Sequence, residues 1–217
     1  MSPVHDDNPI GHREHIRLNT PVESVRRKAG FVEVKARNAE AERFDQVFMA
    51  CHADQALKIL ADPSQRERAV LSAFGYQPNE AILHTDEAVM PQRKLAWAAW
   101  NYHIPASTQE RVAVTYNMNI LQGIDGPVQF CVTLNHAGAI REDRIVRRFQ
   151  YSHPVFTPEA VAAQKQHAFV NGDNRTYFCG AYWANGFHED GVVSALAALE
   201  HFKERLRFEK RNIRRAG

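Results

Sequence analysis

The chain has 217 residues, of which 44% are hydrophobic and 24% charged, and its 27 basic and 25 acidic residues give a formal net charge of +2. This composition is typical of a globular protein with one domain or two small ones, and so small a net charge excludes a general attraction to nucleic acid. No apolar run approaches the roughly 18 to 20 residues of a membrane span, and residues 1–17 lack the apolar core of a signal peptide. We expect no nucleic-acid partner, no transmembrane segment and a cytoplasmic location.

The cysteines and the first histidines carry no recognisable metal motif. Cys51, Cys131 and Cys179 are odd in number, far apart and surrounded by apolar residues. This pattern predicts buried free thiols rather than a disulfide framework or a zinc site. His12 and His15 could share a metal ion, but no motif places a third ligand, so we predict a polar leader over 1–15 and no metal site.

The next stretch predicts strands and a short helix. Residues 16–37 alternate between apolar and polar side chains around Gly30, which predicts two strands joined by a glycine turn. Residues 44–51 form a nearly continuous apolar run, typical of a strand buried on both faces of a parallel sheet. Asp54 is the expected N-cap of a helix over 55–60.

The middle of the chain changes to β-prone sequence. Ser64 and Glu67 have the spacing of a capping box, which predicts a helix to about residue 74. The β-prone runs that follow occupy residues 81–84, 94–102, 111–121, 128–134 and 144–151. The period of two is clearest between Val112 and Ile120, and we expect an inserted antiparallel sheet.

The last part predicts a helix over 159–169, a turn, a strand over 176–179 and a long helix with Asp190 as its N-cap. Small residues beside Gly191 would let a ligand or another backbone approach the start of this helix. On residue types alone, the stretch is either such a ligand-facing helix start or a capped amphipathic helix packed on a sheet. The basic tail at 208–217 is interpreted as a solvated helix end, with contact to phosphates or anionic lipid as the alternative.

Three stretches of the sequence resemble one protein family. Residues 180–202, GAYWANGFHEDGVVSALAALEHF, resemble the C-terminal flavin-contacting segment of FAD-dependent amine-oxidase-like oxidoreductases. The resemblance is to the bacterial predicted NAD/FAD-binding branch, related to flavin-containing amine oxidases and carotenoid desaturases. RLNTPVESVRR and FDQVFMACHADQALKIL resemble the middle of that family, where a strand ends in the segment 50–54. The resemblance covers residues 16–202 and only the later part of the family's pattern.

The resemblance implies FAD as the cofactor and a helix start that faces the flavin. It implies that Val192 offers its backbone N–H and that Tyr182 or Trp183 shields the ring. No catalytic residue is assigned. His188 is a candidate proton relay because histidine is the side chain type most often used for proton transfer, with a surface position or an indirect role as the alternative. The implied flavin contacts are Gly180, Ala181, Tyr182, Trp183, Gly186, Phe187, Glu189, Asp190, Gly191 and Val192.

The inserted sheet lies where the resembled family keeps its substrate domain. Aromatic and amide side chains on it predict a pocket for a small organic or lipid-like substrate. Aromatic residues that alternate along a strand are also typical of a core, which is the alternative. The candidate pocket residues are Trp97, Asn101 and Tyr116, and Trp100, Tyr102 and Asn117 share their character.

One expected motif is absent from the sequence. The resembled family begins with a strand, a G-x-G-x-x-G turn and a helix that hold the FAD pyrophosphate. None of the eleven glycines forms a G-x-G. We therefore expect a truncated FAD-binding domain and weak or absent FAD binding by the chain alone. We also expect an unpaired sheet edge, through which the chain could self-associate.

Together these observations predict a mixed α/β (α+β) fold. An incomplete FAD-binding domain of the amine oxidase type would comprise 16–63 and 152–207, and a mainly antiparallel β substrate domain would be inserted at 64–151. The predicted function is that of the later portion of an FAD-dependent oxidoreductase that removes a hydride equivalent from an organic substrate but is not competent alone. The alternative is a non-catalytic remnant, or a small domain that binds a hydrophobic ligand or a protein.

Overall fold

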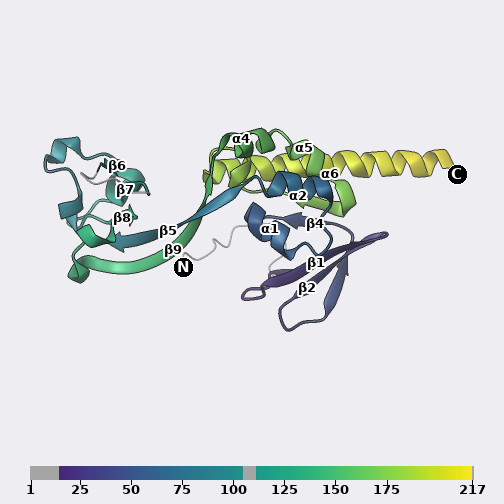
Figure 1. Cartoon of the computed structure of the whole chain (residues 1–217), viewed down its shortest axis with the longest axis horizontal. Helices are drawn as coiled ribbons and strands as arrows, with labels where there is room; N and C mark the ends of the chain where they lie inside the picture. Colours follow the sequence, from purple (N-terminus) through teal and green to yellow (C-terminus); the bar gives the residue numbers. More distant parts are fainter. Residues whose placement is uncertain (1–14, 105–110, 217) are drawn as a thin grey trace. The chain divides into compact units, whose positions relative to one another are not determined.

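The computed structural model describes residues 15–104 and 111–216, with side chains up to residue 208. The chain forms two compact units (Figure 1). Unit 1 comprises Met1–Phe74 and Phe156–Gly217, and unit 2 comprises Gly75–Val155. Residues 1–14 of the predicted leader, including His12, and residue 217 of the tail lie outside the described residues. The predicted functions of the two domains stay predictions.

Unit 1 begins with a three-stranded antiparallel sheet of β1 (Val22–Lys28), β2 (Phe31–Ala36) and β3 (Ala41–Phe44). Gly30 lies between the first two strands with φ 93°, a backbone conformation that favours glycine. The predicted pair of strands joined by a glycine turn is thus confirmed.

A second sheet in unit 1 contains the parallel strands β4 (Val47–Met49) and β10 (Thr176–Phe178), with Phe178 beside Met49. The prediction of one continuous strand over 44–51 was wrong. Phe44 ends β3 in the other sheet, where its side chain is 44% exposed. The local apolar run could not reveal that change of sheet, because each short piece pairs with a strand distant in sequence.

The helices of unit 1 are α1 (Ala53–Ile59), α2 (Gln65–Leu71), α4 (Pro158–Gln164), α5 (His167–Val170) and α6 (His188–Ala216). The predicted capping box of α2 is confirmed, because the Ser64 hydroxyl accepts from the Glu67 N–H and the Glu67 carboxylate accepts from the Ser64 N–H. Asp54 is not an N-cap, since α1 begins at Ala53 after His52. The helix predicted over 159–169 is divided between α4 and α5.

The long helix α6 packs on one face of the β4–β10 pair. Tyr177, Cys179 and Ala198 are buried together, and Phe202 packs against them. The Phe48 ring stacks on Tyr177 with ring centroids 4.7 Å apart. This packing fixes the loop between β10 and α6. None of the helices in the described part of the chain is long and apolar enough to cross a membrane.

Unit 2 contains a five-stranded antiparallel sheet in the order β6-β7-β8-β5-β9, which confirms the predicted arrangement. The strands are β5 (Gly75–His84), β6 (Trp100–His103), β7 (Ala113–Asn117), β8 (Cys131–Leu134) and β9 (Ile145–Val155). The β-run predicted over 111–121 ends early. The Asn117 carboxamide accepts the Ile120 N–H at 3.1 Å and starts the short helix α3 (Met118–Gln122).

Short 3₁₀ helices complete the two units. In unit 2 they are η2 (Glu87–Val89), η3 (Lys94–Ala96), η4 (Ala137–Ala139) and η5 (Glu142–Arg144), and in unit 1 they are η6 (Asp173–Arg175) and η7 (Ala181–Trp183). The start of the β-run predicted over 94–102 is therefore helical. Strand β6 begins only at Trp100.

A buried ion pair joins three elements of unit 1. The side chains of Arg27 on β1 and Glu67 on α2 are 5% and 1% exposed. The Arg27 Nη1 and Nη2 atoms donate to the two Glu67 carboxylate oxygens at 3.0 and 2.8 Å. Nη2 also donates to the Asp62 carbonyl at 2.7 Å, and Nη1 donates to the Thr176 hydroxyl on β10 at 3.4 Å. One guanidinium therefore connects β1, α2 and β10.

We predict that Arg27→Met lowers the free energy of unfolding by about 3–5 kcal/mol, because Glu67 would remain buried without its cation. Denaturation with urea near neutral pH measures the change. The control is Arg26→Met on the exposed side of β1, where we expect a change within about 0.5 kcal/mol. Equal losses in the two variants would contradict a specific role for the buried pair.

Candidate functional site

The candidate site lies where β4 and β10 end. Ligands of open α/β sheets bind beyond the carboxyl ends of the parallel strands. Residues 50–52 leave β4 at this end, and Gly180 follows β10. The Gly180 N–H donates to the Ser194 hydroxyl at 2.9 Å, and that hydroxyl donates to the Gly191 carbonyl at 2.8 Å. Ser194, which is buried, thus ties the loop to the first turns of α6.

Two of the predicted flavin contacts are buried aromatic residues. Tyr182 and Trp183 are 3% and 8% exposed. Their rings lie 4.9 and 5.2 Å from the Phe74 ring, and Trp183 also packs edge-on against His167 at 4.7 Å. The structure thus places both rings in the interior of unit 1. Their role as a shield for a flavin stays a prediction.

The exposed part of the predicted loop lies at the start of α6. Gly186, Phe187, His188 and Glu189 are exposed, and so is Val192. Ala181 and Gly191 are half-buried. The structure therefore gathers one subset of the predicted contacts on the surface and separates it from the buried rings.

The predicted N-cap at Asp190 was wrong. Helix α6 begins at His188, so Asp190 lies within its first turn. Its carboxylate accepts from the N–H groups of Asn185 and Phe187 at 3.0 and 2.9 Å, which precede the helix. Together with Glu189 it places two carboxylates at the helix start. This local negative charge disfavours a phosphate group and suits a neutral part of a ligand.

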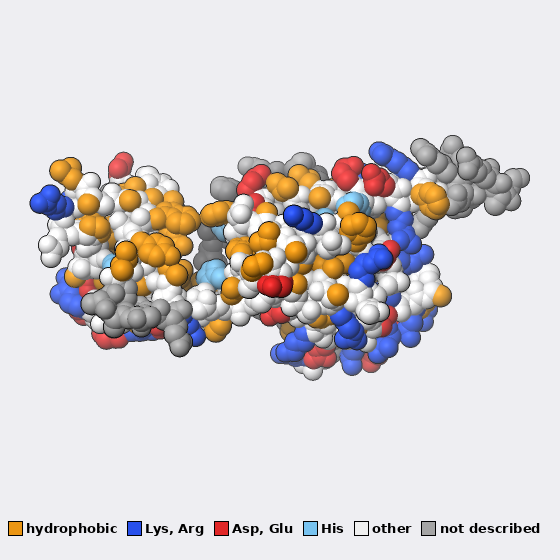
Figure 2. Space-filling model, turned by 45° about the horizontal axis from the view of Figure 1, so that its top comes forward, with side chains coloured by type: hydrophobic (Ala, Val, Ile, Leu, Met, Phe, Trp, Pro, Cys, Tyr) orange, Lys and Arg blue, Asp and Glu red, His pale blue; other side chains and the backbone are white. Residues whose placement is uncertain are grey.

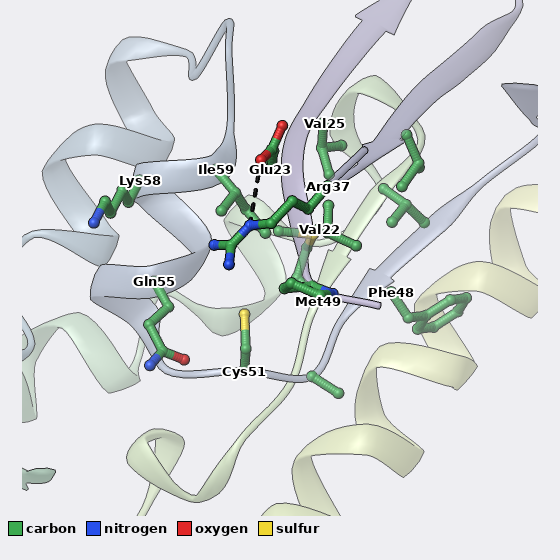
Figure 3. Close-up of a pocket in the computed structure, with 14 residues that line it drawn as sticks. Val22, Glu23, Val25, Arg37, Phe48, Met49, Cys51, Gln55, Lys58 and Ile59 are labelled. Carbon is green, nitrogen blue, oxygen red and sulfur yellow. Dashed lines mark ion pairs between the residues drawn. The ribbon is translucent and has the colours of Figure 1, made fainter. Parts of the chain in front are cut away.

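Unit 1 also contains an open groove of about 700 Å³ beside β4 (Figure 3). Its polar groups include Lys58, Gln55 and an ion pair between Glu23 and Arg37 at 3.5 Å. The Cys51 side chain points into the groove. The pKa of its thiol is raised, mainly by burial and to a smaller extent by the charges of Cys179 and Asp54. The remaining lining is Pro21, Val22, Val25, Val34, Val47, Phe48, Met49, Ala50 and Ile59.

The sequence patterns did not identify this groove. None of the ten predicted flavin contacts lines it. One feature of the sequence did indicate part of the groove: the family resemblance marks residues 50–54 as the end of a strand, and Ala50 and Cys51 line the groove. The partner walls come from β1, β2 and α1, and no local pattern indicates that these elements converge on β4.

Unit 2 separates the predicted substrate-pocket residues. The Tyr116 ring packs against Trp100 across β6 and β7, with centroids 5.1 Å apart. Asn101 lies on the opposite face of β6, where its Nδ2 donates to the Ala98 carbonyl at 2.7 Å. The Trp97 Nε1 donates to the Pro91 carbonyl at 2.8 Å. The structure therefore does not bring Tyr116 together with Asn101. The Asn101 amide and the Trp97 indole both donate hydrogen bonds to backbone carbonyls.

The face of the sheet that bears Tyr116 is partly apolar and exposed. Trp100 and Tyr102 alternate with Asn101 along β6 and are 52% and 68% exposed. Figure 2 shows apolar side chains gathered on the visible surface of unit 2. Burial first, then the neighbouring Tyr102, raises the pKa of Tyr116, which keeps its phenol neutral. This face can contact an uncharged organic molecule.

The opposite face of the same sheet carries a chain of buried polar side chains. The Asp86 N–H donates to His84 Nδ1 at 3.1 Å, so the neutral His84 carries its proton on Nε2. That nitrogen lies 2.7 Å from the Thr133 hydroxyl, which is 2.7 Å from the Thr115 hydroxyl. Thr115 lies 3.0 Å from His103 Nε2. The two hydroxyl groups therefore link His84 to His103 through consecutive hydrogen bonds.

The described residues contain no recognisable metal site. Within residues 15–104 and 111–216, no group of three or more His, Cys, Asp or Glu side chains could hold a metal ion. The Cys51, Cys131 and Cys179 thiols are free.

Comparison with known proteins identifies the type of fold. Residues 11–118, about half of the chain, match the family of flavin containing amine oxidoreductases. A CLA-producing fatty acid isomerase from P. acnes has 13% identity and a TM-score of 0.55, over 88% of this chain and 47% of that one. Wild-type putrescine oxidase bound to putrescine has 12% identity and a TM-score of 0.54, over 85% and 49%. The chain is amine-oxidase-like.

These likenesses confirm the predicted fold class, a partial fold of the amine oxidase type. At such low identities the solved structures show the fold alone. The amine-oxidase-like chain spans about half the length of the solved structures that it matches. A search of the curated proteins finds no significant match.

We predict that alanine has opposite effects on the stability of unit 1 at Gly180, which follows β10, and at Gly191, in the first turn of α6. A Cβ at Gly180 would lie 2.6 Å from a carbon of the buried Tyr182 ring, so Gly180→Ala should destabilise unit 1 by about 1–3 kcal/mol. At Gly191, inside α6, the nearest atom would be 3.8 Å away, so Gly191→Ala should stabilise it by about 0.5–1 kcal/mol. Thermal and urea unfolding measure both changes. Equal effects would show that the close approach at Gly180 does not constrain the loop.

We predict that the amine-oxidase-like chain loses stability when the pH falls below about 6.5, the ordinary histidine pKa. Burial is the main cause that lowers the pKa of His84, His103 and His167. Below the unfolded pKa, the unfolded chain therefore binds protons that the folded chain does not bind. The neutral histidines contribute fully to the free energy of unfolding above the unfolded pKa, and this contribution is lost as the pH falls through their pKa values in the folded chain. Histidine NMR titration and urea unfolding at several pH values test it. Titration of all three at the unfolded pKa would contradict the prediction.

Proposed function

We propose that this chain is the later portion of an FAD-dependent oxidoreductase that removes a hydride equivalent from an organic substrate. The observation that carries the proposal is the parallel β4–β10 pair in a chain related to flavin containing amine oxidoreductases. The groove beside β4 and the loop that begins α6 both adjoin this pair. Such an arrangement is the usual ligand position of a nucleotide-binding sheet.

The residues of this region fit parts of FAD. The groove offers apolar walls with Arg37, Lys58 and Gln55, which suit a ring system with polar edges. The two carboxylates at the start of α6 do not suit the pyrophosphate, and the sequence contains no G-x-G. We infer that the chain supplies contacts to the cofactor's rings and that the phosphates need donors from outside this sequence. We therefore expect FAD binding by the chain alone to be weak.

When bound, FAD would accept the hydride equivalent, and the protein would hold and orient the reactants. In unit 2, the exposed rings of Trp100 and Tyr102 beside Tyr116 form the proposed wall for a small organic or lipid-like substrate. These three rings carry no charge, which favours an apolar substrate over a charged one. Exposed His188 is proposed as a proton relay at the loop. A cytoplasmic location stays a prediction.

The proposal is tested by adding excess FAD to the purified chain and recording the flavin absorption and fluorescence. We expect a weak, saturable change in the spectrum. Two variants then locate the contact: Cys51→Phe fills the groove, and Gly191→Trp obstructs the start of α6. Each should weaken the association if its region touches the flavin.

Circular dichroism provides the control that both variants remain folded. No change in the flavin spectrum at any FAD concentration would overturn the proposal for this chain and favour a non-catalytic remnant or ligand-binding domain. Equal flavin affinity in Gly191→Trp and the original chain would show that the start of α6 does not face the cofactor.

A further inference from the structure

A second pocket of unit 1 lies at the amino end of β10, at the opposite end of this strand from the candidate site. Its volume is about 710 Å³, and six of the seven described residues that line it are polar or charged. They come from α2 and its N-cap, from η6 and from α6: Ser64, Gln65, Arg66, Asp173, Asn174 and Arg205. None of them lines the groove or belongs to the predicted flavin contacts. Because nucleotides bind beyond the carboxyl ends of parallel strands, this pocket is separate from the proposed flavin site.

Two guanidinium groups are positioned at this pocket by backbone carbonyls. The Arg66 Nη1 atom donates to the Phe169 carbonyl at 3.3 Å, and the Arg205 Nη1 atom donates to the Gly172 carbonyl. A guanidinium has five N–H donors in one plane, so it can bind a carbonyl and an oxyanion at the same time. The two arginines therefore present positive charge to the pocket from defined positions.

Two other lining residues are held by the buried pair of Arg27 and Glu67. The Ser64 N–H donates to the Glu67 carboxylate at 2.7 Å. The Ser64 hydroxyl accepts from the Glu67 N–H at 3.1 Å, and a hydroxyl that accepts a hydrogen bond still has one proton to donate. The Asn174 carbonyl accepts from the Thr176 hydroxyl at 3.1 Å, and that hydroxyl accepts from Arg27. Ser64 and Asn174 are therefore in place before a ligand binds, which lowers the entropy cost of binding.

The chemistry of the lining favours a phosphate group. A phosphate monoester carries a charge of about −1.5 to −2 near neutral pH and has three strongly accepting oxygens. Two arginines match that charge, and Ser64, Gln65 and Asn174 add hydroxyl and amide donors. A carboxylate, with two oxygens and one charge, would use fewer of these groups. An apolar ligand is disfavoured because Ala69 supplies the one aliphatic side chain among the described residues of the lining.

Asp173 is the one acidic residue among the described residues of this lining. Its Oδ2 atom lies 3.7 Å from Arg66 Nη1, and both side chains are 60% exposed. An ion pair so exposed contributes little to stability, so an incoming dianion can replace Asp173 at Arg66. The competition between the two anions distinguishes this pocket from a general basic surface.

We propose that this pocket binds the phosphate group of a small phosphorylated molecule, with Arg66 and Arg205 as its cationic partners. Ser64, Gln65 and Asn174 supply the neutral contacts to the phosphate oxygens. The pocket is a second binding site of unit 1, and it goes beyond the proposed oxidoreductase function without depending on it.

The test is an NMR titration of the purified chain with inorganic phosphate, in a phosphate-free buffer of low ionic strength and without FAD. We expect saturable shifts of the backbone amides of residues 64–66 and 173–174. Arg66→Gln and Arg205→Gln should each weaken the affinity about tenfold or more, because each loses a charge-assisted hydrogen bond. Asp173→Asn should raise the affinity about twofold to fivefold, because it removes the competing carboxylate.

Arg68→Gln and Arg207→Gln are the matched controls. Both residues are exposed and lie on the same helices, α2 and α6, but outside the pocket lining. Each control removes the same charge as its test variant, so the affinity should change by less than about twofold. Circular dichroism verifies that all the variants are folded. Equal weakening in Arg66→Gln and Arg68→Gln would overturn the proposal, because a general attraction between charges would then explain the binding.

The remaining outcomes also decide the question. Glycerol 3-phosphate should shift the same amides as inorganic phosphate, and absence of saturable shifts with either compound would overturn the proposal. Weaker binding in Asp173→Asn, or tighter binding of malonate than of phosphate, would contradict the assigned chemistry and overturn it too.

A lipid headgroup is the other source of a phosphate group. Binding to vesicles that contain phosphatidic acid, without a response to inorganic phosphate or glycerol 3-phosphate, would assign the pocket to a membrane surface and overturn the proposal. Because FAD is absent from the experiment, failure of flavin binding leaves the result unchanged, and the two proposals fail separately.

Discussion

The structure of unit 1 depends on the buried guanidinium of Arg27. It binds Glu67 through two hydrogen bonds and also contacts Asp62 and Thr176. A buried charge is tolerated only when its partner and its remaining hydrogen bonds are supplied, and here three separate elements supply them. The pair fixes β1 relative to β10, and β10 carries β4. The walls of the groove are therefore held by a polar contact that itself lies outside the groove.

The hydrogen bond from Arg27 to Thr176 on β10 also helps to stabilise the small parallel sheet of β4 and β10. Strands β4 and β10 share only three pairs of residues, from Val47 beside Thr176 to Met49 beside Phe178. One face is covered by α6, whose Phe202 ring packs edge-on against the stacked rings of Phe48 and Tyr177. The outer edge of β4 has no such cover from a strand in the part of the chain that was mapped. Unit 1 thus combines a buried, hydrogen-bonded ion pair with a short parallel sheet whose strand β4 is partly exposed.

Unit 2 uses the two faces of one sheet differently. One face carries the hydrogen-bonded chain of buried His84, Thr133 and Thr115 with half-buried His103, and the other exposes Trp100 and Tyr102. A hydrogen-bonded polar chain across three strands favours one arrangement of those strands, because a shift in register would leave its members without partners. The ordered inner face therefore supports the aromatic outer face proposed as a substrate wall.

The sequence by itself determined the local features and carried the resemblance to amine-oxidase-like proteins. The Ser64–Glu67 capping box and the turn at Gly30 depend on residues close in the chain, so their patterns predicted them correctly. The motifs at 50–54 and 180–202 likewise carried the family resemblance. Only the tertiary structure decided which face each side chain occupies: it buried Tyr182 and Trp183, separated Asn101 from Tyr116, and brought β1 and α1 against β4. These outcomes depend on contacts between residues far apart in sequence, which no local periodicity records.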